Sequence, residues 1–124
     1  MLIMIECDLP LWWLQWPWHE RVAVMLGHTV DETTYVTSMV PVPNVHQTPA
    51  EDFAVLRRDA DRAVVVGRTL VGFLHTHPAG FLEPSDSDYL GLPDGLVGVV
   101  MCGTHLTGYT KEGPAQVEQV PPTV

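Results

Sequence analysis

The chain has 124 residues, of which 46% are hydrophobic, and it carries a formal net charge of −9. This length predicts one domain, residues 1–124, with a core large enough to be stable without disulfide bonds. Six cationic side chains against fifteen acidic ones exclude the clustered Lys and Arg of a nucleic-acid-binding surface and argue against binding to an anionic membrane. We see no signal peptide, and we expect a cytoplasmic protein.

The N-terminal part predicts a strand followed by a tryptophan-rich segment. Leu2–Cys7 is the strand candidate, and a short helix is expected after it. The segment 11–19 holds all four tryptophans of the chain, Trp12, Trp13, Trp16 and Trp18. The spacing of Trp12 and Trp16 places them on one helical face. We expect the four rings to cover one side of a sheet, and the alternative is an exposed patch that binds a partner protein.

Two segments then predict a hairpin. Val22–Gly27 is an apolar run that predicts a buried strand, and Thr33–Val40 is β-branched and partly alternating, as expected for its partner. Asp31 and Glu32 would lie near the turn between them.

A helix is predicted to follow this hairpin. Thr48–Glu51 has a capping Thr, a Pro for the first helical position and a Glu that completes a capping box. Apolar residues at spacings of three and four continue the pattern as one stripe: Phe53, Leu56, Ala60 and Val64. We therefore expect a helix from Thr48 that ends between Ala63 and Gly67.

The C-terminal part predicts three more strands. Val97–Cys102 is a continuous apolar run that suits a central strand. His105–Thr110 alternates as its hairpin partner, and Val117–Val120 would form a last edge strand. With the preceding elements, this order predicts an α/β domain in which helices flank a mixed β-sheet.

Two histidines stand two residues apart after the apolar run Leu70–Leu74. If this run is a strand, its period of two places His75 and His77 on one side, where both imidazoles can reach the same ion. Asp88 follows after a loop, and Ser85 suits the N-cap of a short helix that contains it. Two His and one Asp are ligands of the types that Zn²⁺ takes, with a fourth position left for water.

The string His75-Thr76-His77-Pro78, followed by Pro84-Ser85 and then Asp88, resembles the signature of the JAMM metallopeptidases. These are the catalytic branch of the MPN (JAB1/Mov34) domain family. The resemblance covers about residues 20–110 and implies the MPN fold. It also implies one zinc ion per chain, held by His75, His77 and Asp88.

The same resemblance implies two catalytic residues. The catalytic Glu of the family stands seven residues before a Gly, and Glu20 and Gly27 have this separation. The small Cys-Gly pair that usually follows the Glu is replaced here by Val22 and Ala23. Glu20 would act as the general base, and Ser85 would donate a hydrogen bond to the oxyanion of the tetrahedral transition state.

By this resemblance we expect a zinc-dependent peptidase or isopeptidase that hydrolyses an amide bond, after the C-terminal tail of a ubiquitin-like or sulfur-carrier protein. The chain is similar to compact prokaryotic and phage members of the family. One alternative is a JAB-type peptidase acting on a phage tail or cell-wall component, incorporated in a phage assembly. The other is a non-catalytic MPN scaffold with a partner at the Trp12–Trp18 region, although such members normally lose the histidines or the Asp.

Overall fold

The computed structural model describes residues 1–48, 52–64, 68–78 and 80–120. Within these residues the elements follow one another as β1 (Leu2–Ile5), α1 (Leu11–Leu14), β2 (Val22–Val30), β3 (Thr33–Val42), α2 (Arg57–Ala63), β4 (Thr69–Thr76), α3 (Asp86–Gly91), β5 (Val97–Cys102), β6 (His105–Thr110) and β7 (Gly113–Gln119). This confirms the predicted α/β architecture with a mixed sheet. None of the described helices is long and apolar enough to cross a bilayer.

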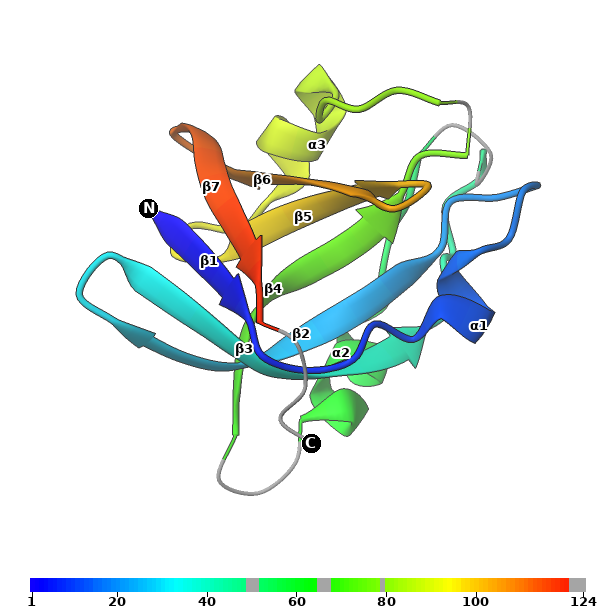
Figure 1. Cartoon of the computed structure of the whole chain (residues 1–124). Coiled ribbons are helices and arrows are strands. Elements are labelled where there is room, and N and C mark those ends of the chain that lie inside the picture. Colours follow the sequence, from blue (N-terminus) through cyan, green and yellow to red (C-terminus); the bar gives the residue numbers. More distant parts are fainter. Residues whose placement is uncertain (49–51, 65–67, 79, 121–124) are drawn as a thin grey trace.

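The sheet closes on itself, in the strand order β1-β3-β2-β4-β5-β6-β7 (Figure 1). β1 pairs in parallel with β3 and with β7, and β4 pairs in parallel with β5, whereas the remaining pairs are antiparallel. The prediction that the last strand lies at an edge is therefore wrong. Its first residues pair with β6 and its last residues pair with β1, so β7 closes the sheet instead of ending it.

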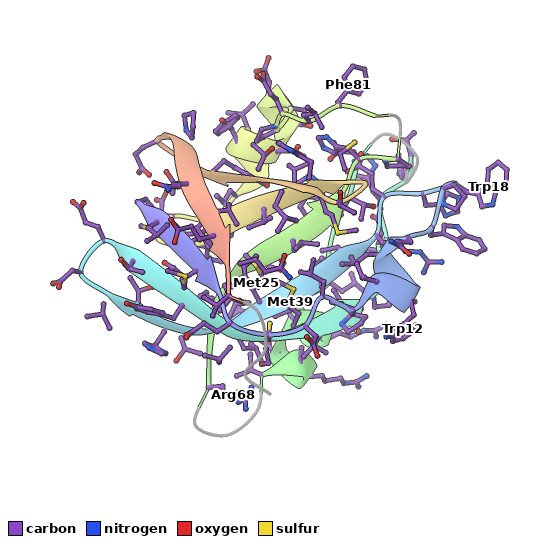
Figure 2. All side chains as sticks on the ribbon, in the orientation of Figure 1. Trp12, Trp18, Met25, Met39, Arg68 and Phe81 are labelled. Carbon is purple, nitrogen blue, oxygen red and sulfur yellow. The ribbon has the colours of Figure 1, made fainter. Side chains whose placement is uncertain are left out.

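The predicted hairpin of β2 and β3 is present, and the turn residue Asp31 has a positive φ of 54°. The first part of β2, residues 22–26, is a continuous apolar run because both of its faces are covered. Met25 lies in the cluster inside the closed sheet, and Figure 2 shows it there beside Met39. Val22 and Val24 instead pack on the outer face against Ala60 of α2.

The helix predicted from Thr48 begins only at Arg57. The expected first turn, 49–51, lies outside the described residues, and 52–56 is not helical. The Asn44 side chain explains this difference, because it donates to the carbonyl oxygen of Asp52 (2.9 Å) and accepts from the Ala54 N–H (3.0 Å). These bonds give the backbone an alternative to the helical pattern.

The prediction that the four tryptophans cover a sheet is wrong for three of them. The exposed fractions are 81% for Trp12, 44% for Trp16 and 68% for Trp18. α1 is a single turn that buries Leu14 in place of the indoles, and it ends before Trp16. Only Trp13 among them packs against the core.

We predict that Gly27→Ala lowers the free energy of unfolding by about 3 kcal/mol. A Cβ at this position would lie 1.8 Å from the backbone oxygen of Tyr35, and this strand pair cannot move apart without breaking its ladder. Urea denaturation measures the effect. Gly91→Ala is the matched control, because a Cβ there meets nothing within 4 Å. Equal stability of the two variants would contradict the close approach of β2 and β3.

Candidate metal centre

The pairing of β2 with β4 brings Glu20 to the histidines. Val22 lies opposite His75 in the antiparallel register. Immediately beyond this pair, the Arg21 N–H donates to the Thr76 hydroxyl (2.9 Å) and the Thr76 N–H donates to the Arg21 carbonyl (3.0 Å). The side-chain amide of Asn44 also donates to the carbonyl oxygen of Glu20 (2.8 Å). The backbone that directly follows the Glu20 side chain is therefore held in place.

Helix α3 supplies the carboxylate of Asp88 through a capping box. The Ser85 hydroxyl accepts a hydrogen bond from the Asp88 N–H (3.1 Å), and Asp88 Oδ2 accepts one from the Ser85 N–H (2.9 Å). The predicted N-cap is thus present. This reciprocal pair fixes the rotamer of Asp88 and directs its carboxylate towards β4.

Three ligand atoms converge at this point. Nε2 of His75 and Nε2 of His77 lie 3.2 Å apart, and each lies 3.1 Å from Asp88 Oδ2. Atoms bound to a tetrahedral Zn²⁺ at 2.0–2.2 Å lie about 3.4 Å from one another. The spacing and the donor types therefore fit such an ion. With Glu20 included, the ligand atoms of the group all lie within 4.8 Å of one another.

The surroundings of the two histidines orient their rings. His75 is fully buried and stacks on Phe53, with ring centroids 4.3 Å apart. Tyr109 meets the His75 ring edge-on at 6.2 Å. Nδ1 of His77 lies 3.1 Å from the carbonyl oxygen of Phe81, which can only accept. This contact holds a proton on Nδ1; a metal would take the place of the proton with which Nε2 donates to Asp88 in the metal-free protein.

Burial and local charge set the protonation states. Burial raises the pKa of Glu20 to about 8, and the neighbouring Asp88 charge adds to this shift. Burial also lowers the pKa of His75. Burial alone would raise the pKa of Asp88, but hydrogen bonds from His75 and His77 outweigh it and hold this pKa well below its usual range. A neutral His75 and an ionised Asp88 are the forms that bind a metal.

Ser85 lies at the exposed rim of the centre. Its hydroxyl is 3.1 Å from that of Ser87, which donates its only hydrogen to Asp52 (3.1 Å). Ser85 is therefore the donor in the pair that it forms with Ser87. His46 lies near this rim and faces Asp52 at 3.8 Å, but it does not belong to the group that could hold the ion.

Sequence reasoning missed three neighbours of the centre. Phe53 fits the apolar stripe of the predicted helix, yet it packs on His75. No motif in the sequence points to Asp52. Tyr109 belongs to a segment predicted as an alternating strand, and this pattern does not show that its ring lies over β5. The ring fits there because Gly98 has no side chain: a Cβ at Gly98 would lie 2.2 Å from Tyr109 Cζ.

The fold and the site together define a JAB1/MPN-type domain with a candidate metal centre. Residues 14–115 match the family described as prokaryotic homologs of the JAB domain, and the chain belongs to this family. The matched range spans the positions of Glu20, both histidines and Asp88, and the match confirms the family resemblance inferred from the sequence. A search among curated proteins found no match.

Solved structures share the fold at low identity. A protein from Desulfitobacterium hafniense, solved in solution, has a TM-score of 0.77 at 20% identity, covering 98% of this chain and 94% of that one. A JAB1/MPN domain protein from Archaeoglobus fulgidus has a TM-score of 0.51 at 17% identity, with 82% and 81% covered. A structure described as JAMM, a metalloprotease-like zinc site in the proteasome and signalosome, has a TM-score of 0.53 at 14% identity, with 98% and 100% covered.

The three converging ligand atoms predict about one zinc ion per purified chain, measured by elemental analysis. His77→Ala should lose this zinc. His28→Ala, which changes an exposed histidine away from the site, should keep it. Because the ion would tie β4 to α3, chelation should lower the melting temperature of the wild type. A protein that contains no zinc and takes none up on addition would contradict the assignment.

Glu20 should make the metal-free protein less stable as pH rises. The pKa of its carboxyl is about 4.5 in the unfolded chain and about 8 in the folded chain. Between these pH values the folded chain therefore binds more protons than the unfolded chain, and the folded state loses stability as pH rises. Glu20→Gln removes this effect. In chelated samples the variant should be more stable than the wild type by a few kcal/mol at pH 8, and the gap should close towards pH 4.5. A difference in unfolding free energy between Glu20→Gln and the wild type that does not change with pH would contradict this prediction.

Proposed function

We propose that this domain is a zinc-dependent peptidase that hydrolyses an amide or isopeptide bond. The observation that carries the proposal is a buried carboxylate beside a complete set of ligands. Glu20 Oε1 lies 3.9 Å from His75 Nε2, whereas Asp88 Oδ2 lies at 3.1 Å. Oε1 of Glu20 also has no hydrogen-bond partner among the described residues. These distances support our assignment of Asp88 as a ligand and of Glu20 as a neighbouring base.

A zinc ion held by His75, His77 and Asp88 would supply a Lewis acid and would lower the pKa of water to about 7. The residues of the chain would then perform the proton transfers. Glu20 would accept a proton from the attacking water and give it to the leaving amine. In the metal-free protein burial raises the pKa of Glu20 to about 8, and a cation held by the neighbouring ligands would lower this pKa towards the range in which Glu20 is an ionised base.

Ser85 is the residue that we propose for stabilising the oxyanion. Its backbone N–H already donates to Asp88, so the hydroxyl is the donor that Ser85 has left for an oxyanion. The hydroxyl hydrogen points to Ser87 in this structure. A single rotation about the Cβ–Oγ bond would redirect it, because Ser85 can keep accepting from the Asp88 N–H while it donates elsewhere.

The burial of the centre supports a flexible segment as the substrate. Glu20 and Asp88 are each 4% exposed and His75 is fully buried. A bond within a rigid folded surface cannot approach such atoms, whereas an extended tail can. We therefore propose the C-terminal tail of a ubiquitin-like or sulfur-carrier protein as the substrate.

Glu20→Gln should keep zinc and fold normally but cleave roughly 10²–10⁴-fold more slowly, because Gln cannot accept a proton. The rate is measured on peptide amides and on tail fusions of ubiquitin-like proteins, followed by mass spectrometry. Asp88→Asn should instead lose zinc. Glu83→Gln is the matched control, since it makes the same change on an exposed residue of the metal loop. A Glu20→Gln protein that cleaved at the wild-type rate would refute the base assignment.

A further inference from the structure

A small pocket adjoins the metal centre on the side of the tryptophan-rich segment. It has a volume of about 200 Å³, and its walls include Leu14, Trp16, Pro17, His77, Pro78 and Met101. We call this hollow the Trp16 pocket. Three segments of the sequence form it: the end of α1 with the loop that follows on one side, and the ends of β4 and β5 on the other. None of the residues that line it is an Asp, Glu, Lys or Arg.

The wall that Trp16 provides is anchored to the sheet. The indole N–H of Trp13 donates to the carbonyl oxygen of Val22 (3.2 Å). The guanidinium of Arg21 lies 4.0 Å from the centroid of the Trp13 ring and 5.0 Å from that of the Trp16 ring. Arg21 is itself paired with Thr76 at the end of β4. The pocket is thus held in a defined position relative to His77, as a preformed binding site requires.

We propose that the Trp16 pocket binds a bulky apolar side chain of a polypeptide substrate, at a position next to the bond that is cleaved. This proposal rests on the peptidase function above. Because His77 is both a wall of the pocket and a candidate ligand, a side chain seated there brings its own backbone to the metal centre. Successive Cα atoms are only 3.8 Å apart, so the seated residue lies close to the reacting bond.

The size and lining of the pocket select the kind of side chain. Its volume is several times the roughly 30 Å³ that one water molecule occupies in the liquid, which suits Leu, Met or Phe. Polar occupants would find few partners against Leu14, Pro17 and Met101. Trp12 and Trp18 project outward from the same part of the chain (Figure 2), and Trp18 would extend the contact to the rest of a protein substrate.

Binding is tested on the zinc-loaded full chain by NMR, with the four indole N–H signals as reporters and with the methyl signal of Met101, which also lines the pocket, as the reporter in variants of Trp16. The probes are N-acetyl-leucine methylamide and N-acetyl-glycine methylamide. The leucine probe should shift the Trp16 signal saturably and leave the Trp12 signal in place, and the glycine probe should shift neither. Trp16→Ala should weaken binding of the leucine probe roughly tenfold or more. Trp16→Phe should restore most of the binding, and Trp12→Ala is the exposed control.

The proposal is overturned if the leucine probe shifts no indole signal, or if Trp16→Ala binds it as tightly as the wild type. Peptide cleavage assays distinguish failure of the pocket proposal from failure of the peptidase proposal. With peptide amides that carry Leu or Gly beside the scissile bond, Trp16→Ala should raise KM about tenfold for the Leu peptide alone, with kcat less affected. Probe binding without cleavage of any peptide supports the pocket and refutes the peptidase. Cleavage without preference refutes the pocket and supports the peptidase.

Discussion

The antiparallel ladder between β2 and β4 is the constraint on which the centre depends. It sets Val22 opposite His75, so the residue two positions before the ladder, Glu20, reaches the histidines from a distant part of the sequence. The reciprocal bonds between Arg21 and Thr76 extend this alignment past the last ladder pair. A slip of one residue would turn both imidazoles to the opposite face. Apolar packing on both faces of β2 opposes such a slip.

The centre concentrates ionisable groups that are almost entirely buried. Glu20, His75 and Asp88 are nearly or fully buried, and burying a carboxylate without a full set of partners costs folding free energy. The raised pKa of Glu20 is a consequence of this cost. The lowered pKa of Asp88 shows that hydrogen bonds from the histidines outweigh the cost of burying its charge. A divalent cation among the same atoms would offset the remaining cost, so binding of the metal and stability of the fold are linked. The apolar rings around His75 strengthen this linkage by excluding water.

Local signals in the sequence predicted local structure well. The period of two along β4 placed both imidazoles on one side, and the Ser85–Asp88 spacing predicted the capping box that aims the carboxylate. Non-local effects were not predictable in this way. Closure of the sheet depends on β7 reaching β1 across the whole chain, and the extended stretch at Phe53 depends on Asn44, whose side chain competes with helical hydrogen bonds. The exposure of Trp12 follows from a helix of one turn, which is too short to cover a sheet. Composition alone favours burial of indole rings and gave the opposite expectation.

The central claim is that His75, His77 and Asp88 share one ion while Glu20 stays outside its coordination. A crystal structure of the zinc-loaded protein, with anomalous diffraction measured at the zinc edge, tests this most directly. The account predicts one anomalous peak within about 2.0–2.2 Å of the two Nε2 atoms and of an Asp88 carboxylate oxygen, with both oxygens of Glu20 farther away. A peak coordinated by Glu20 in place of Asp88, or one located outside this group of side chains, would contradict it.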